Sequence, residues 1–196
     1  MTRIIADISP TIDGYVAGPG VTMEEPFGTI GERIHDWHGM GDVETTDADR
    51  AQSQRMFDGV GAVVLGRRMF DLGEEPWGDD GAFGVPCFVV TKRPRDTLVK
   101  GPTTFTFVTD GLESAVSQAR EAAGDKNIVI PGGGDIVRQC LAAGLIDELR
   151  LHVVPVLLGG GTPMFGDVST MTEFEIVDVV STPMATHITY RLDNRR

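Results

Sequence analysis

Mostly apolar runs alternate with segments of helix-forming composition along the chain. These runs predict strands that are covered on both faces, at residues 3–9, 61–66, 87–91, 105–108 and 127–130. Helices are expected at residues 31–37, 47–58, 110–124 and 135–143, with a further short helix directly after Gly66. Alternation of this kind is typical of a mostly parallel sheet with helices on both faces.

Capping residues and glycines define the expected helix ends. Thr46 with Asp49 has the spacing of a capping box, and so does Asp110 with Glu113. Asp135 stands at the start of the last helix, where an N-cap role is expected. Stops are expected at Gly59, Gly124 and Gly144.

The C-terminal part predicts antiparallel strands. Residues 149–159 predict one long strand, in which Pro155 indicates an edge or bulge position. Strands at 173–180 and 185–192 would form a hairpin, which makes the sheet mixed. Near the other end, residues 15–17 could extend the first strand, and the Gly-, Pro- and acid-rich residues 18–46 form an irregular segment that would cover a site or move. The predicted fold class is therefore α/β, a single domain over residues 1–196.

Composition and charge narrow the possible partners. The 196 residues carry a formal net charge of -12, so neither nucleic acid nor an anionic membrane is expected as a partner. The sequence contains no run of 18 apolar residues and no signal-peptide pattern, which predicts a cytoplasmic protein without a transmembrane helix. Cys87 and Cys140 lack metal-ligand spacing, and His35 and His38 lack a third ligand, so no metal is expected.

Two basic loops follow predicted strands, where a doubly wound sheet binds its ligand. In LGRRMFD, residues 65–71, Arg67 and Arg68 stand at the start of a short helix, a combination that suits a phosphate. VTKRPR, residues 90–95, is the most basic stretch of this acidic chain. Thr91, Lys92 and Arg93 would suit an isolated phosphate, such as the 2′-phosphate of NADPH.

A third loop, IPGGGD at residues 130–135, contains three consecutive glycines between a strand and a helix. Glycines at such a place let a phosphate approach the backbone closely, although the spacing is not the GxGxxG of a Rossmann fold. Each of the three loops, taken alone, also fits an ordinary solvated or tight turn. Their common position in the predicted topology favours a shared ligand.

The ordered set IDGYVAG, VVLGRRMF, FVVT and VIPGGGD, followed by a helix and a long strand, resembles the dihydrofolate reductase superfamily. Over nearly the whole chain it is most similar to the reductase domain of bacterial riboflavin biosynthesis, the RibD C-terminal family. The resemblance implies a three-layer dihydrofolate reductase-like fold, NADPH as hydride donor and a homodimer.

The resemblance also assigns residues to the cofactor. The pyrophosphate and adenosine phosphate would contact Gly66, Arg67 and Arg68, and the 2′-phosphate would contact Thr91 and Lys92. The diphosphate turn would comprise Gly132, Gly133 and Gly134, with Asp135 and Ile136 at the start of the next helix. The nicotinamide would lie beside Ser9 and the stretch from Tyr15 through Val16 to Ala17.

Met69 and Asp135 depart from the family pattern, and Ile34 departs from the pattern of dihydrofolate reductases. Asp135 stands near the diphosphate turn, where a basic or neutral residue would suit a phosphate better. Met69 stands where the family often has Thr, which removes one expected hydrogen bond to phosphate. Dihydrofolate reductases carry a carboxylate on the first helix that binds the pterin and assists protonation. When GERIHDW is aligned on its tryptophan, Ile34 occupies that position. Folate reduction is therefore disfavoured.

The candidates for proton transfer are Asp13, Glu32, His35 and Asp36, and Trp37 is a candidate for substrate contact. Asp13 also fits a turn-shaping role, and Glu32 and Asp36, four apart, could share a solvated helix face. Trp37 fits stacking on a planar heterocycle and equally a core anchor. The histidines at positions 152 and 187 lie in predicted strands and are interpreted as structural.

Three functions stay open at this point. The first is an NADPH-dependent reductase for a small heterocycle or ribosylamino compound, such as 5-amino-6-(5-phosphoribosylamino)uracil. The second is a pterin or folate reductase, and the third is a nucleotide-binding protein without catalysis. A substrate phosphate would need basic residues beyond the three loops, and only Arg33, Arg50 and Arg55 remain for it.

Overall fold

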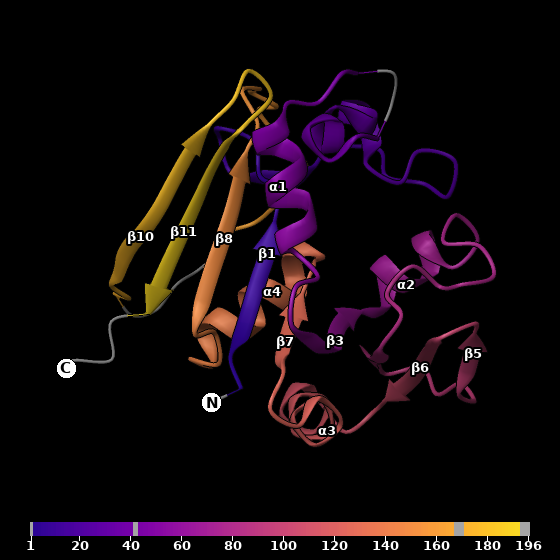
Figure 1. Ribbon diagram of the computed structural model, residues 1–196. Helices are drawn as coiled ribbons and strands as arrows, with labels where there is room; N and C mark the ends of the chain where they lie inside the picture. Colours follow the sequence, from indigo (N-terminus) through magenta and orange to yellow (C-terminus); the bar gives the residue numbers. More distant parts are fainter. Residues whose placement is uncertain (1, 41–42, 167–170, 193–196) are drawn as a thin grey trace.

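A nine-stranded mixed sheet forms the centre of the computed structural model, which describes residues 2–40, 43–166 and 171–192 (Figure 1). The strand order is β10-β11-β8-β1-β7-β3-β4-β6-β5. These strands are β1 (Ile4–Ile8), β3 (Val60–Gly66), β4 (Pro86–Val90), β5 (Leu98–Lys100), β6 (Thr103–Val108), β7 (Asn127–Ile130), β8 (Glu148–Val153), β10 (Phe174–Ser181) and β11 (Thr186–Leu192). A second, two-stranded sheet pairs β2 (Tyr15–Ala17) with β9 (Thr162–Pro163).

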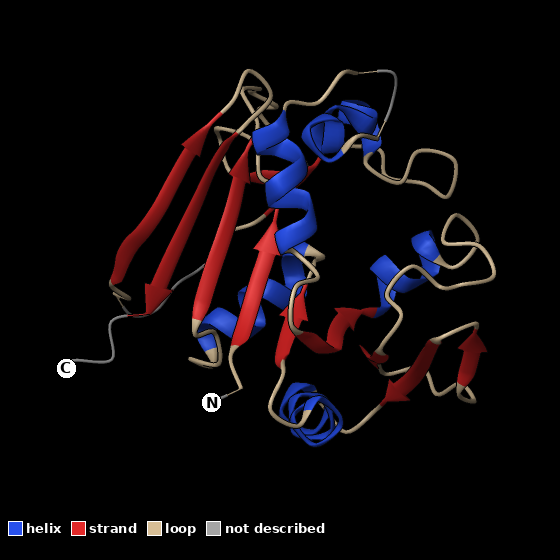
Figure 2. Ribbon diagram, viewed as in Figure 1, coloured by secondary structure: helices blue, strands red, loops and turns tan. Residues whose placement is uncertain are grey.

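The helices lie on both faces of the large sheet (Figure 2). They are the 3₁₀ helix η1 (Gly28–His38) and the α-helices α1 (Asp47–Arg55), α2 (Arg67–Gly73), α3 (Leu112–Ala123) and α4 (Gly134–Ala142). One apolar cluster joins α3 and α4 to Ile4, Ala6 and Ile8 of β1. On the opposite face, Phe70 of α2 packs in a separate cluster with Ile5. The alternation along β1 therefore divides the core into two layers, one on each side of the sheet.

The predicted fold class is confirmed, including the antiparallel hairpin of β10 and β11 at the C-terminal end. Two details of the prediction are wrong. Residues 15–17 do not extend β1, because they form β2 and pair with β9. The strand predicted over 149–159 ends at Val153 and lies inside the sheet, between β1 and β11. Pro155, which has no backbone N–H to donate, therefore follows the strand and marks no edge.

Two of the three predicted caps are wrong. The capping box of Thr46 and Asp49 is present at α1. Helix α3 begins after Gly111 without a side-chain cap, so Asp110 and Glu113 form no capping box. Helix α4 begins one residue earlier than predicted, after Gly133, so the carboxylate of Asp135 lies inside the first turn. It accepts hydrogen bonds from the side chains of Arg138 and Gln139.

The helix expected at residues 31–37 is present, with a different geometry. It is a 3₁₀ helix that begins earlier, at Gly28, and Gly31 interrupts it with a φ of 58°. No helix in the described part of the chain is long and apolar enough to cross a membrane.

Candidate functional site

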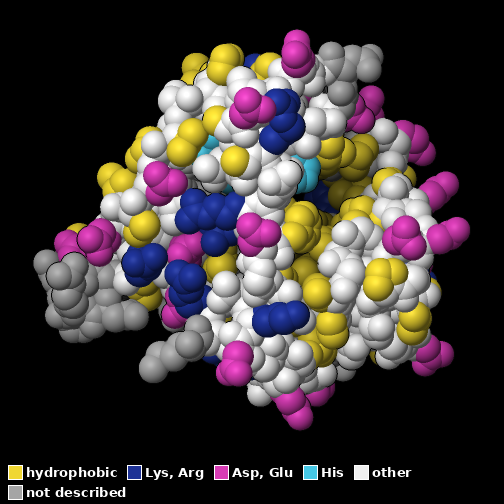
Figure 3. Space-filling view, in the orientation of Figure 1, with side chains coloured by type: hydrophobic (Ala, Val, Ile, Leu, Met, Phe, Trp, Pro, Cys, Tyr) yellow, Lys and Arg dark blue, Asp and Glu magenta, His cyan; other side chains and the backbone are white. Residues whose placement is uncertain are grey.

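The carboxyl ends of four neighbouring parallel strands lie at one edge of the sheet. Strands β1, β7, β3 and β4 are adjacent and all parallel. The segments that follow them begin with Ser9, with the turn at 131–134, with Arg67 and with Thr91. The topology therefore brings together all the loops that the sequence predicts for the cofactor. Figure 3 shows a recess lined by hydrophobic side chains between the region of η1 and the region of α2.

Side chains connect these loops to one another. Nη1 of Arg67 donates a hydrogen bond of 3.1 Å to the carbonyl oxygen of Arg93, which joins the loop after β3 to the loop after β4. A Cβ atom at Gly132 would lie 3.5 Å from Sδ of Met69. The turn after β7 therefore contacts the loop after β3. The three loops form one continuous surface.

The glycine turn between β7 and α4 has room for a ligand at one position and none at another. A Cβ atom at Gly134 would lie 2.9 Å from both the carbonyl oxygen of Pro163 and Cγ2 of Val16. A Cβ atom at Gly133 would meet no atom within 4 Å. Gly132 has a φ of 139°, a conformation that L side chains rarely adopt. The backbone at Gly133 is thus open at the start of α4, where free N–H groups attract anions.

The arginines beside this turn already have acidic partners. Asp71 accepts 2.6 Å hydrogen bonds from Nε of Arg67 and from Nη2 of Arg93. Burial raises the pKa of Asp71, but the two arginines outweigh this effect and the pKa is lowered. Arg95 binds Glu74 through both terminal nitrogens, at 2.7 and 2.6 Å. Asp71 thus fixes the positions of two guanidinium groups while it remains ionised.

The other predicted phosphate contacts differ in exposure. Thr91 is buried, and its hydroxyl accepts a 3.0 Å hydrogen bond from the backbone N–H of Arg93. Lys92 is exposed. Arg68 reaches toward the irregular segment that precedes η1, where its Nη2 lies 3.5 Å from the carbonyl oxygen of Val21. Ile136 is buried beneath the turn, and a Cβ atom at Gly66 would lie 3.8 Å from it.

The nicotinamide side predicted from the sequence contains a buried tryptophan. Trp37 is 1% exposed, and its Nε1 donates a 2.9 Å hydrogen bond to Oγ of Ser9. Its ring stacks on His152 with 4.0 Å between centroids. Ile34, at the position that aligns with the reductase carboxylate, is fully buried in the same cluster. This geometry favours the core-anchor interpretation of Trp37. Val16 and Ala17 lie in β2 and are half-buried.

Asp13 is saturated with hydrogen bonds. Its carboxylate accepts from Oγ1 of Thr11 at 2.6 Å, from the N–H of Leu158 at 3.0 Å and from the N–H of Gly159 at 2.7 Å. The hydrogen bond from Thr11, followed by that from Gly159, lowers the pKa of Asp13. The geometry favours its turn-shaping role, because an ionised carboxylate has no proton to donate.

Glu32 and Asp36 do not share a helix face, which corrects the prediction. Glu32 is exposed, whereas Asp36 is buried and accepts a 2.8 Å hydrogen bond from Arg33. The reason is the 3₁₀ geometry of η1, in which residues three apart are aligned and residues four apart are not. Neither carboxylate lies beside the other.

A buried polar chain on β1, β8, β11 and α1 was not predicted as part of the site. It contains Asp7, His152, His187 and Asp49. One signal was present in the sequence. In ELRLH, residues 148–152, polar and apolar residues alternate, so an interior strand presents one polar face. Burial lowers the pKa of the nearby His35 to about 3. The described residues contain no group of three potential ligands that could hold a metal ion.

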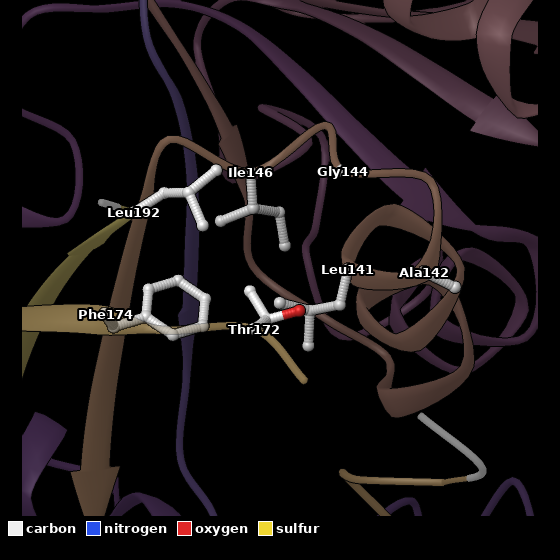
Figure 4. Close-up of a pocket in the computed structure, with 7 residues that line it drawn as sticks. All are labelled: Leu141, Ala142, Gly144, Ile146, Thr172, Phe174 and Leu192. Carbon is white, nitrogen blue, oxygen red and sulfur yellow. The ribbon is translucent and has the colours of Figure 1, made fainter. Parts of the chain in front are cut away.

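A cavity of about 140 Å³ lies at the C-terminal end of α4 (Figure 4). It is lined by Leu141, Ala142, Gly144, Ile146, Thr172, Phe174 and Leu192. None of these residues belongs to the predicted site, and none carries a charge that would bind a phosphate.

Comparisons with known proteins identify a family and a shared fold. The model of the RibD C-terminal domain matches residues 2–188. The uncharacterized protein YyaP of Bacillus subtilis (strain 168) is 26% identical over 196 residues, which cover 90% of this chain and 87% of YyaP.

Two solved structures share the fold. A protein of Shewanella sp. PV-4 assigned to riboflavin biosynthesis superposes with a TM-score of 0.71 at 22% identity, covering 98% of this chain and 100% of the other. Dihydrofolate reductase of Enterococcus faecalis, in complex with NADP(H), superposes with a TM-score of 0.61 at 16% identity. The superposition covers 98% of this chain and 97% of the reductase. The structural likeness establishes the fold, and the family model establishes the membership: the chain belongs to the RibD C-terminal domain family.

Proposed function

We propose that this protein is an NADPH-dependent reductase that transfers hydride to a small heterocyclic or ribosylamino substrate. The observation that carries the proposal is the convergence of three phosphate-competent loops at the carboxyl edge of β7, β3 and β4. Membership in a reductase family and the NADP(H) bound to a reductase of the same fold support it.

The residues present fit a dinucleotide phosphate. The open backbone at Gly133 and the amino end of α4 would hold the diphosphate, with Arg67 and Arg68 beside it. Thr91 and the exposed Lys92 would hold the 2′-phosphate. NADPH supplies the hydride when bound, and the protein's task is to orient the cofactor and exclude water.

The residues expected to contact the substrate distinguish among the candidate substrates. The buried Ile34 leaves no carboxylate at the position that binds pterin in dihydrofolate reductases, so a riboflavin-type substrate is favoured over folate. The basic residues that remained for a substrate phosphate are all paired. Arg33 binds Asp36, Arg50 binds Asp47 and Arg55 binds Asp178. We therefore propose a substrate whose recognition depends on its heterocycle more than on a phosphate.

The first experiment is a fluorescence titration with NADPH and with NADH. We expect tighter binding of NADPH, and we expect Arg67→Ala to weaken it about 10- to 100-fold, because a charge-assisted hydrogen bond contributes roughly 1.5–3 kcal/mol. Lys126→Ala is the matched control, because Lys126 is exposed just before β7, at the opposite edge of the sheet. Equal affinity of wild type and Arg67→Ala would contradict the assigned site. No binding of either dinucleotide would favour a non-catalytic protein.

We also propose a cytoplasmic homodimer in which β10 contributes to the interface. Strand β10 is at the edge of the sheet and exposes Ile176, Val177 and Val179. Exposed apolar edge strands promote pairing with a second chain. Size-exclusion chromatography with light scattering should show a dimer for wild type and a monomer for Val179→Lys. A wild-type monomer would contradict the proposal.

A further inference from the structure

Four buried side chains form a continuous hydrogen-bonded chain across the face of the sheet beneath η1 and α1. Oδ1 of Asp7 lies 2.8 Å from Nε2 of His152. Nδ1 of His152 lies 2.7 Å from Nδ1 of His187. Nε2 of His187 lies 3.1 Å from Oδ1 of Asp49. The chain joins β1, β8, β11 and α1, and all four side chains are at most 3% exposed.

Both carboxylates at the ends of this chain are hydrogen-bond acceptors. Asp49 accepts hydrogen bonds from the backbone and hydroxyl of Thr46 and from Oγ1 of Thr182, at 2.6 to 3.0 Å. Oδ2 of Asp7 has no hydrogen-bond partner, but it lies 3.5 Å from Nη1 of Arg150, with which Asp7 forms an ion pair. The donors around Asp49 keep its carboxylate ionised, and at Asp7 the guanidinium of Arg150 is the cation that pairs with the carboxylate. Each aspartate therefore requires an N–H group on the imidazole nitrogen that faces it.

The number of ring protons follows from these two requirements. If Nε2 of His152 and Nε2 of His187 each carry a proton, two neutral rings have only lone pairs left on their Nδ1 atoms. Two lone pairs would then face each other at 2.7 Å, in a buried environment that penalises unsatisfied polar atoms. A third proton between the Nδ1 atoms turns this contact into a hydrogen bond. It also makes the pair a cation between two anions.

We infer that His152 and His187 share one proton between their Nδ1 atoms, and that this buried cationic pair holds Trp37 in position at the acceptor side of the site. Trp37 stacks on the ring of His152 and donates to Ser9, which follows β1 at the site edge. The two histidines are thus positioning residues. The protonation state stands on the geometry alone, and only its effect on the reaction rests on the proposed function.

The charged groups around the pair limit it to a single proton. Asp7, Asp49 and Arg150 surround it from β1, α1 and β8, and Arg150 is itself bound to Glu148 at 2.8 Å. Helix η1 contributes two further histidines, His35 and His38, which both interact electrostatically with His152. Burial and the neighbouring His152 lower the pKa of His187, so a second proton is not taken up.

Removal of the shared proton should weaken the assembly. Without this proton the lone pairs of the two Nδ1 atoms face each other at 2.7 Å, and the contact between the rings is lost. One substitution makes the shared proton between the two Nδ1 atoms unnecessary. In Asp49→Asn, an amide N–H can donate to Nε2 of His187. The bond between the two Nδ1 atoms then needs only the proton of a neutral His187.

The amide of this variant also satisfies its other neighbours. Its oxygen can replace Oδ2 of Asp49 as the acceptor from Thr46. The hydroxyl of Thr182 can turn to the carbonyl oxygen of Ala185, which lies 3.1 Å away. Asp49→Asn is therefore expected to fold, and circular dichroism will verify this. Asp7→Asn applies the same logic at the other end of the chain, if the first variant fails to fold.

The test is a long-range ¹H–¹⁵N NMR spectrum of the histidine rings at pH 7. For the two rings of the pair we expect three N–H groups in wild type and two in Asp49→Asn. Asp47→Asn is the matched control, because Asp47 lies fully exposed on the same helix. It should keep three. Two ring N–H groups in wild type, or three in a folded Asp49→Asn, would overturn the inference.

The reaction supplies a second and separate readout. We expect hydride transfer from NADPH to lose kcat at alkaline pH in wild type, with KM for NADPH nearly unchanged, and we expect this alkaline loss to be absent in Asp49→Asn. A protein that shows three ring N–H groups and no NADPH binding would contradict the proposed function alone. A protein that reduces substrate and shows two ring N–H groups would contradict the shared proton alone.

Discussion

Replacement of Trp37 by Phe distinguishes a core anchor from a substrate-stacking residue. The indole is 1% exposed, stacks on His152 at 4.0 Å between centroids and donates to Ser9 at 2.9 Å. Phe retains an aromatic ring but removes the N–H donor and part of the buried ring. If Trp37 is an anchor, the variant should lose stability whether or not a ligand is present.

The expected loss is the sum of two effects. A hydrogen bond between uncharged groups contributes about 1 kcal/mol to stability. A large-to-small change in a core that cannot collapse fully costs roughly 1–3 kcal/mol for a change of this size. The variant should therefore be about 2–4 kcal/mol less stable, and the melting temperature of a chain of this length should fall by roughly 5–15 °C.

The assay is thermal and urea unfolding followed by circular dichroism, together with Ser9→Ala and the double variant. Because the two side chains share one hydrogen bond, the effects of the two single variants should not add, and the difference measures their coupling. An unchanged melting temperature for Trp37→Phe, combined with weaker substrate binding, would refute the core-anchor reasoning and favour stacking on a heterocycle.

Three further changes test separate parts of the structure. Gly134→Ala should lower both stability and NADPH affinity, because its methyl group would lie 2.9 Å from Pro163 and Val16; unchanged unfolding and binding curves would contradict the close approach. Asp13→Asn should destabilise the turn after β1, because the backbone N–H groups of Leu158 and Gly159 lose an ionised acceptor. A variant that melts like wild type and has lost only catalysis would instead indicate a proton donor. Burial lowers the pKa of His35 in the folded protein to about 3, whereas the same side chain in the unfolded chain takes up a proton below about pH 6.5. The free energy of unfolding should therefore fall as the pH falls from about 6.5 to about 3. Urea unfolding should show a shallower fall for His35→Gln, and an equal slope in both proteins would contradict the burial argument.

Local patterns were sufficient for much of the fold. The apolar runs that became β3, β4 and β7 were predicted within a residue or so of their ends. Strands β5 and β9 were not predicted, because three and two residues are too short to show a period. The failed caps at Asp110 and Asp135 have another cause. Helices α3 and α4 begin after Gly111 and Gly133, neither of which has a side chain that could cap the helix. The capping residues that the sequence suggested, Asp110 and Asp135, therefore lie one residue before and two residues after the actual cap positions.

The candidate site, like the fold, could be predicted from the sequence only in part. The three phosphate loops could be predicted because each follows a strand directly, and the order of parallel strands then brings their ends together. The residues beneath η1 could not be predicted in this way. Asp7 and His152 are 145 positions apart in the sequence. Asp7 is an isolated polar residue in an apolar strand, and the alternation around His152 does not show which strand its polar face meets. Only the pairing of β1 with β8 reveals that they face the same buried space.

Helices η1, α1 and α2 cover the same face of the sheet, but the part of this face beneath η1 and α1 is polar, whereas the part beneath α2 is apolar. Beneath α2, Phe70 packs on apolar side chains, and hydrophobic contacts of this kind tolerate small shifts. Beneath η1, the side chains from Asp7 to Asp49 form their hydrogen bonds in one arrangement of rings and carboxylates, in which Oδ2 of Asp7 has no hydrogen-bond partner. A buried polar network that is only partly satisfied is less stable than an apolar core, so a displaced η1 or α1 is strongly disfavoured. The polar face therefore fixes the position of Trp37 and Ser9, at the end of the site where the hydride acceptor must align with the cofactor.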